Sequence, residues 1–352
     1  MNLDDWQAFP SLDPQGMLTE INGLPSQMER AWEQAQSLAL PHTEGIRRVL
    51  IAGMGGSAIA ADLLQAYAAP LACVPLIVWR EYDLPAYAAG PETLFIASSH
   101  SGNTEEVLST FDAAKDAGLT MVAIATGGAL AERAREADCP LWLLDHQGQP
   151  RAAVGASFGY LLGLLCRLGF IPDAAQHMAQ AVQTMRKQQA AVGAQVPVEE
   201  NPAKRLAAQL IGRWPTIVGA DLLAPVARRW RTQIAELSKS PANFEALPEA
   251  DHNMLAGWKA PPDLIEKSIV VFLHSDFCQM RNQLRIKLTR QVIGAEGVST
   301  DLFAAKGPNP LAQQWTGLHF GDYVSYYLAM AYGQDPTPVS ILQEFKRQLG
   351  AV

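Results

Sequence analysis

The chain has 352 residues, of which 49% are hydrophobic and 18% are charged, a composition that suits about two globular domains and excludes a disordered protein. Its 27 Lys and Arg against 35 Asp and Glu give a formal net charge of −8. Because no basic stripe occurs, nucleic acid is excluded as a partner. The sequence contains no secretory signal pattern and no apolar run of about 18 residues, so we expect no membrane partner and a cytoplasmic protein.

The first half of the chain alternates short apolar runs with helical segments rich in Ala, Leu and Glu. The runs predict strands at residues 49–52, 74–79, 93–98, 121–126 and 141–144, with helices at 58–68, 105–117 and 130–137. Continuous apolar runs suit strands that are buried on both faces, and strands alternating with helices favour a parallel, doubly wound sheet. An apolar helix over 153–168 closes this half.

The second half repeats this alternation more loosely. We predict strands at 216–219, 269–274 and 297–303, and helices at 203–213, 222–239, 276–293, 310–332 and 340–349. The predicted fold is therefore α/β, with two doubly wound domains whose parallel sheets are flanked by helices. Their predicted limits are 1–172 and 201–352, the second ending in a terminal helix, and the helical segment 173–200 connects them.

A glycine-rich turn, Gly53–Ser57, joins the first predicted strand to its helix. Glycines allow the backbone to approach an anion closely, and Ser57 would lie near a helix N-terminus, where the dipole favours negative charge. The spacing matches neither the dinucleotide fingerprint nor the phosphate loop of the nucleotide triphosphatases. A tight turn without a ligand is the alternative interpretation.

A second polar loop, Ser98–Glu106, follows another predicted strand and opens a helix. It contains four hydroxyl side chains in seven residues. One of them would serve as the N-cap of the helix, and the surplus favours phosphate binding by a neutral cradle of hydroxyl and amide groups. We expect the phosphate ligands to be Gly56, Ser57, Ser99, Ser101 and Thr104.

These two motifs together resemble the sugar isomerase (SIS) domain family. Further segments resemble, in order, the bifunctional phosphoglucose/phosphomannose isomerase family, over about residues 45 to 330. They are Pro150–Ala153, Trp230–Lys239, Leu247–Asn253 and Asp301–Gly307. Three positions depart from that family's pattern. Leu237 replaces an Asn, Met254 replaces a Glu, and His100 replaces the aromatic residue between the two loop serines.

The resemblance implies an aldose–ketose isomerase that interconverts fructose 6-phosphate with glucose 6-phosphate and mannose 6-phosphate through a cis-enediolate, with no cofactor or metal. Such chemistry requires a carboxylate base, an acid/base group for ring opening and a cation beside the enediolate. Glu236, flanked by apolar Ile234 and Leu237, is the expected base. A solvated surface glutamate is the alternative.

The remaining roles follow from the same resemblance. His252 would open the sugar ring, because imidazole titrates near neutrality, and in relatives this histidine comes from the partner subunit, which implies a homodimer. Arg151 would stabilise the enediolate as a permanent cation, and Lys306 would assist near the ring oxygen. The alternatives are a loop residue that caps a helix for His252 and an ion pair at a domain boundary for Arg151.

Two rival functions stay open. One is a non-catalytic SIS sensor that binds a phosphosugar, which would need the two loops but neither Glu236 nor His252. The other is an SIS isomerase of another sugar phosphate, although such enzymes usually carry one SIS domain per chain. The histidines show no metal-ligand spacing, which disfavours a metal-dependent isomerase.

Overall fold

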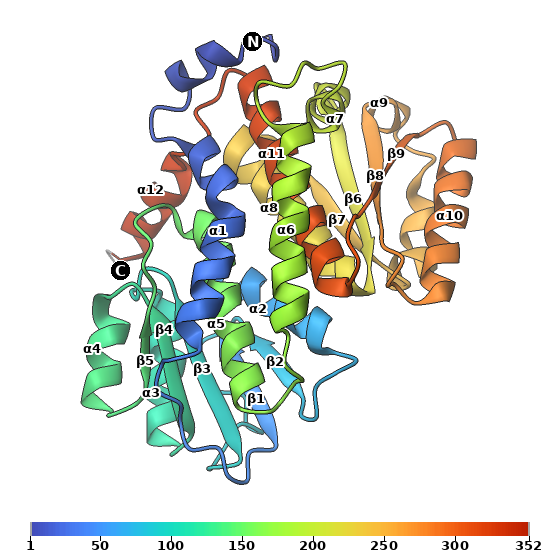
Figure 1. The fold of residues 1–352 in the computed structure, drawn as a ribbon. Helices are drawn as coiled ribbons and strands as arrows, with labels where there is room; N and C mark the ends of the chain where they lie inside the picture. Colours follow the sequence, from blue (N-terminus) through green and yellow to red (C-terminus); the bar gives the residue numbers. More distant parts are fainter. Residues whose placement is uncertain (1, 351–352) are drawn as a thin grey trace. The chain divides into compact units, whose positions relative to one another are not determined.

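A computed structural model describes residues 2–350 of the chain (Figure 1). They form two compact units. We call Gly23–Met185 with Gly307–Gln314 the five-strand unit, and Met1–Asn22 with Arg186–Lys306 and Trp315–Val352 the four-strand unit. None of the helices among residues 2–350 is both long and apolar enough to cross a membrane.

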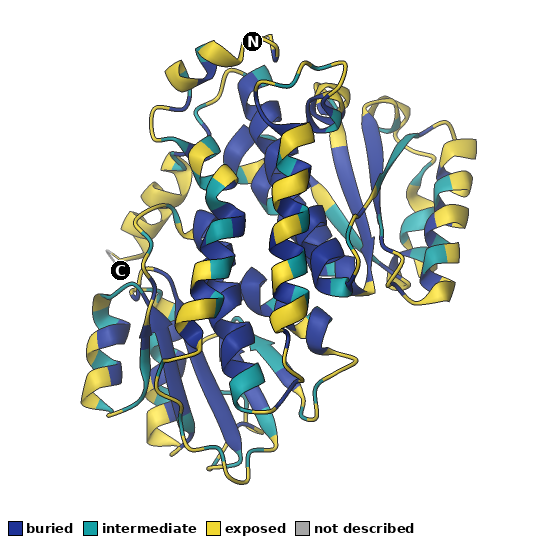
Figure 2. Ribbon diagram, in the orientation of Figure 1, coloured by how far each residue is buried: buried dark blue, intermediate teal, exposed yellow. Residues whose placement is uncertain are grey.

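All strands of the five-strand unit are parallel, and they lie in the order β2-β1-β3-β4-β5. The strands are β1 (Arg48–Ala52), β2 (Leu76–Trp79), β3 (Thr93–Ser99), β4 (Thr120–Ala125) and β5 (Leu141–Leu143). Every residue of β3 is buried, and Figure 2 shows the central strands as continuously buried. The predicted double burial is confirmed for β1, β3 and β4. It is wrong for β2 and β5, which are only partly buried because they lie at the two edges of the sheet.

The helices of this unit follow the strands as predicted. They are α2 (Gly55–Ala68), α3 (Glu105–Asp116), α4 (Gly128–Glu136), the short 3-10 helix η2 (Pro150–Ala153) and α5 (Val154–Arg167). Alternate strand residues such as Leu50 and Phe95 form one apolar core with Phe111 of α3 and Leu130 of α4. Helices α2 and α5 contact each other and form a second pair in this unit.

The four-strand unit contains a second parallel sheet, with strand order β7-β6-β8-β9. The strands are β6 (Trp214–Ala220), β7 (Asn243–Leu247), β8 (Ser268–His274) and β9 (Ser299–Ala304). The sheet ends at β9, whereas the corresponding strand of the five-strand unit, β4, is followed by β5. The predicted fold class, two parallel sheets flanked by helices, is therefore confirmed.

Among the described residues, eight helical segments lie wholly within this unit, apart from the N-terminal turn η1 (Trp6–Ser11). They are α7 (Pro202–Leu210), η3 (Asp221–Leu223), α8 (Ala224–Ser238), η4 (Glu249–His252), η5 (Met254–Gly257), α9 (Pro262–Glu266), α10 (Met280–Ala295) and α12 (Ser340–Leu349). On α8, the buried guanidinium of Arg229 binds both carboxylate oxygens of the buried Asp322, at 3.1 and 3.0 Å. This ion pair joins α8 to the helix that carries Asp322.

Three helices contain residues of both units, namely α1 (Met17–Ala35), α6 (Ala175–Val192) and α11 (Pro310–Ala331). The units therefore group the chain differently from the predicted domain limits. The first residues group with the second half of the chain, and Asp4 accepts a hydrogen bond from the Val198 amide there. The predicted connector 173–200 contains α6, which is divided between the units at residues 185 and 186.

Candidate active site

The two glycine- and serine-rich motifs meet at one edge of the five-strand sheet. They follow β1 and β3, which are neighbours in register, with Ala52 paired to Ala97. The strand order reverses at this pair, because β2 lies on one side of β1 while the chain continues through β3 on the other. Such a switch point, at the carboxyl ends of parallel strands, is where open α/β sheets bind ligands.

Hydrogen bonds join the two motifs directly. The Ser57 hydroxyl, which is buried, accepts from the His100 amide at 3.2 Å. The His100 carbonyl accepts from the Thr126 amide at 2.9 Å and the Thr126 hydroxyl at 2.7 Å. The loop after β3 is therefore tied both to the turn after β1 and to the end of β4.

The hydroxyls of the second loop do not cap the helix that follows, α3. Thr104 is the N-cap residue of α3 but makes no side-chain cap bond. Its hydroxyl lies 2.8 Å from the Ser99 hydroxyl instead, so the expectation of a capping hydroxyl at this helix is wrong. Met54, the N-cap residue of α2, provides no side-chain cap either. Two helix N-termini thus face this edge without a capping side chain, an arrangement that favours an anion.

Two glycines are required by close backbone approach. A Cβ atom on Gly56 would lie 2.5 Å from the Pro150 carbonyl oxygen and 3.2 Å from the Arg151 Cα. A Cβ on Gly102, which has a φ of +67°, would lie 1.8 Å from the Gly127 carbonyl oxygen. The close approach at Gly56 places the backbone of Pro150 and Arg151 directly against the turn after β1.

Arg151 itself is buried, and its guanidinium donates to the Gln149 side chain at 3.3 Å. The structure therefore brings together, within one unit, the five predicted phosphate ligands and the predicted cation. These are Gly56, Ser57, Ser99, Ser101, Thr104 and Arg151. Ser101 is the exposed member, and its hydroxyl accepts from the Asn103 amide at 3.2 Å.

Glu236 belongs to the four-strand unit and lies two residues before the end of α8. Its side chain is half-buried, next to the fully buried Leu237. Because α8 connects the parallel strands β6 and β7, it runs back from the carboxyl edge of the sheet to its amino edge. Glu236 therefore lies toward the amino edge.

His252 and Lys306 lie at the opposite edge of the same sheet. His252 ends η4, five residues after the carboxyl end of β7, and is exposed. The neighbouring Asp251 accepts from Arg285 at 2.8 Å and from the Thr289 hydroxyl at 2.6 Å, which fixes this loop on α10. Lys306 is exposed two residues after β9. The four-strand unit thus separates Glu236 from the other two predicted residues.

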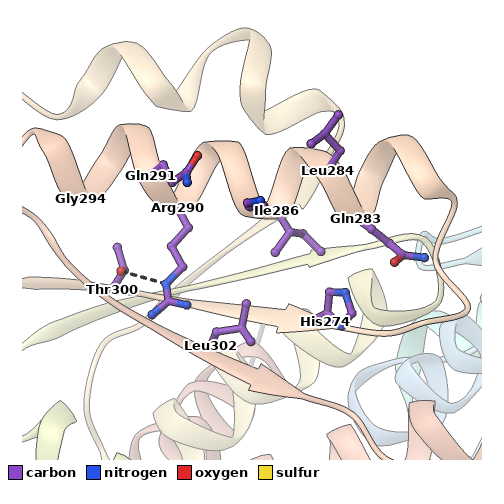
Figure 3. A pocket seen from close by; sticks show the side chains of 10 residues that line it. His274, Gln283, Leu284, Ile286, Arg290, Gln291, Gly294, Thr300 and Leu302 are labelled. Carbon is purple, nitrogen blue, oxygen red and sulfur yellow. Dashed lines mark hydrogen bonds between the residues drawn. The ribbon is translucent and has the colours of Figure 1, made fainter.

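A hollow of about 600 Å³ lies elsewhere in the four-strand unit, between α10 and strands β8 and β9 (Figure 3). Its lining includes His274, Lys287 and Arg290, the last of which donates to the Thr300 hydroxyl at 3.2 Å. None of the predicted site residues lines it. Within residues 2–350, no group of three His, Cys, Asp or Glu side chains is arranged to hold a metal ion.

The sequence analysis missed one residue at this edge of the five-strand sheet. His146, on the segment after β5, lies with its Nδ1 atom 2.9 Å from Nε2 of His100. The two histidines are 46 residues apart in sequence, and neither belongs to a spacing pattern that signals contact. Only the order of the strands brings their segments together.

Comparison with known proteins agrees with the geometry. Residues 199–349 match the family model described as the bacterial phospho-glucose isomerase C-terminal SIS domain. In fold, the chain is similar to a hypothetical protein of Thermus thermophilus, with a TM-score of 0.73 at 15% identity, covering 98% of this chain and 96% of that one. Fold and family model together define a protein of the SIS class.

Relatives in sequence identify the family within this class. The chain is 37% identical to a bifunctional phosphoglucose/phosphomannose isomerase of Caldicellulosiruptor bescii, over 96% of this chain and 99% of the relative. It is 30% identical to the protein of the same name in Aquifex aeolicus, over 94% and 97%. The chain therefore belongs to the bifunctional phosphoglucose/phosphomannose isomerase family, and it is an isomerase. The resemblance inferred from the motifs is confirmed.

Proposed function

We propose that the chain interconverts fructose 6-phosphate with glucose 6-phosphate and mannose 6-phosphate. The observation that carries this proposal is the edge of the five-strand sheet, where hydroxyls and two uncapped helix N-termini face one place beside a buried arginine. A neutral cradle of this kind suits a phosphate dianion in a protein of net charge −8. The names of the relatives supply the hexose phosphates.

The proposed reaction moves one proton between neighbouring carbons. Glu236 removes a proton from C1 of the open-chain ketose, and the electrons form the C1–C2 double bond while O2 takes the negative charge. The proton of the C1 hydroxyl passes to O2, the enediolate collapses to the C1 aldehyde, and Glu236 returns its proton to C2. Arg151 stabilises the negative oxygens throughout. Return to either face of C2 gives glucose or mannose 6-phosphate.

His252 is proposed to act in the site of a second copy of the chain. The topology of the four-strand unit supports this, because Glu236 lies toward the amino edge of the sheet and His252 lies beyond the carboxyl edge. The two side chains would then reach one sugar more readily from two copies of the chain than from one. His252 would open the ring by passing a proton between the anomeric hydroxyl and the ring oxygen, and Lys306, at the same edge, would assist it.

A complementation experiment tests both roles. Glu236→Gln and His252→Gln should each lower kcat by about 100-fold or more, since a general acid or base is lost. When the two variants are co-expressed with different tags, a mixed dimer regains one site with both native residues. Random pairing in a twofold dimer then predicts about a quarter of wild-type activity. Mixed dimers as inactive as either parent would contradict a shared site, and full turnover by Glu236→Gln would remove the proposed base.

A further inference from the structure

The side chain of His100, in the loop after β3, is buried. It points away from solvent, with 8% of the residue exposed, and packs edge-to-face against His146 with ring centroids 5.0 Å apart. The Nε2 atom of His100 lies 2.9 Å from Nδ1 of His146. The two rings therefore form a direct hydrogen bond from the loop after β3 to the segment after β5.

The direction of this hydrogen bond follows from a third group. The Gly148 amide donates to the same Nδ1 atom of His146, at 3.2 Å. A ring nitrogen that accepts from an amide carries no hydrogen. The proton between the rings therefore belongs to Nε2 of His100, and Nδ1 of His146 is the acceptor.

His100 itself is neutral near pH 7. Burial, and after it the neighbouring His146, lower the pKa of His100 to about 4. The ring thus offers a neutral N–H donor at neutral pH and no positive charge. Its contribution to phosphate binding must therefore come through the position of the loop and not through charge attraction.

The backbone of His100 is the junction of the cradle. Its amide donates to Ser57, its carbonyl accepts twice from Thr126, and its two chain neighbours are Ser99 and Ser101. The side chain adds a fourth attachment, to the segment that continues through Gln149 to Arg151. A shift of the ring would therefore displace both loop serines at once.

We propose that His100 and His146 are a positioning pair, in which the His100-to-His146 hydrogen bond holds the loop after β3 in its phosphate-binding geometry. This inference rests on the proposed function, since it concerns the site for the phosphate of the substrate. The phosphate group does not react, so it is bound alike in the ground state and the transition state. Loss of the pair should then weaken substrate binding and leave kcat nearly unchanged.

The first test removes the acceptor. His146→Ala leaves the His100 N–H buried without its partner, and we expect KM for fructose 6-phosphate to rise roughly tenfold. The inhibition constant of inorganic phosphate should rise by the same factor, while kcat stays within about twofold. His146→Asn should restore both constants, because the Asn side-chain oxygen can take the place of Nδ1. His42→Ala, which removes an exposed histidine of the same unit, is the control and should change neither.

The second test removes the donor. His100→Leu should raise both constants as His146→Ala does, and His100→Gln, whose amide can donate from the position of Nε2, should restore them. Equal KM and phosphate inhibition in His146→Ala and the wild type would overturn the pairing role. So would a loss confined to kcat or to the yield of folded protein, because a smaller amount of folded enzyme lowers the apparent kcat but leaves the inhibition constant unchanged.

Failure of the proposed isomerase function can be distinguished from failure of the proposed histidine pair. If the wild-type protein does not turn over fructose 6-phosphate, calorimetric titration with inorganic phosphate replaces the kinetics. A roughly tenfold weaker phosphate dissociation constant in His146→Ala, restored in His146→Asn, would then support the pair without the reaction. Unchanged phosphate binding in both variants would overturn it.

Discussion

The two sheets of this protein carry different residues at the same topological position, the switch point at the carboxyl ends of their central strands. In the five-strand unit, glycines and hydroxyls follow the two strands at the switch point, and neither α2 nor α3 has a side-chain cap. In the four-strand unit the corresponding turn after β6 carries Asp221. Its carboxylate accepts from the Gln279 amide and from the Asn282 side chain, both at 2.8 Å.

The N-terminus of α10 is therefore filled by the protein itself. Gln279 is its N-cap and accepts from the amides of Arg281 and Asn282, while Asp221 supplies the negative charge that the helix dipole favours. One unit leaves its switch point without a side-chain carboxylate, as the proposed anion site requires, and the other closes it with its own carboxylate. A doubly wound fold thus provides the location of an anion site, and the residues of two turns decide whether it is used.

We call the switch point of the four-strand unit, which Asp221 fills, the closed switch point, and that of the five-strand unit the open switch point. The largest change in KM should follow when a carboxylate is introduced at the open switch point. Ser101→Asp places a carboxylate at the exposed rim of the cradle. At a few ångströms from a phosphate dianion, the repulsion should raise KM for hexose 6-phosphates by about a thousandfold. Ser101→Asn, similar in size but neutral, should raise KM far less. Steady-state kinetics of the two variants side by side decide the matter, and equal constants would mean that the phosphate binds elsewhere.

Backbone shape in the open switch point can be tested apart from charge. Gly102→Ala would combine a φ of +67° with a Cβ 1.8 Å from the Gly127 carbonyl oxygen, and should lower the free energy of unfolding by about 3 kcal/mol or more. Gly118 has a φ of +68° but nothing within 4 Å of its Cβ. Gly118→Ala should cost only about 1 kcal/mol. Similar losses in urea denaturation would show that Gly102 is required by its φ alone.

Each unit also contains one buried neutral histidine. Burial lowers the pKa of His319, in the four-strand unit, to about 4, and its Nε2 lies 2.9 Å from the Ile21 carbonyl oxygen. His100 is its counterpart in the five-strand unit.

For both, the folded pKa is below the ordinary value near 6.5, so the unfolded chain binds more protons. Stability should then be lost as the pH falls from 6.5 toward 4, by up to about 3 kcal/mol for each histidine. His319→Gln, which keeps an N–H donor, should flatten this loss in denaturation curves recorded across that range. An unchanged slope would show that His319 does not titrate in this window.

The smallest effect concerns the closed switch point. Asp221→Asn keeps the shape but replaces one acceptor oxygen by an amide, which should destabilise the start of α10 by about 1 kcal/mol. KM for the sugar phosphate should not change, because the proposed binding site is the other switch point. A change in KM equal to that of a cradle variant would contradict the assignment of the two switch points.

Sequence patterns predicted the strands that are continuously apolar, because short runs of this kind, alternating with helical segments, are typical of a parallel sheet. They missed β7, whose sequence of Asn243, Phe244 and Glu245 is half-exposed at a sheet edge, and α1, which contains Pro25. The two loops of the proposed phosphate site were predictable because their glycines and hydroxyls lie close together in sequence. The contact of His100 with His146, and the filling of α10 by Asp221, depend on segments that only the sheet order brings together, so no local pattern could predict them.

If the proposed phosphate cradle serves an isomerisation, the protein must convert fructose 6-phosphate to its aldoses. The most direct test gives purified, EDTA-treated wild-type protein fructose 6-phosphate and detects glucose 6-phosphate and mannose 6-phosphate separately by coupled enzymes. We expect that the wild type forms both aldoses and that Glu236→Gln forms neither at a comparable rate. Tight binding of fructose 6-phosphate by the wild type without either product would contradict it, and would favour a protein that senses the sugar phosphate without converting it.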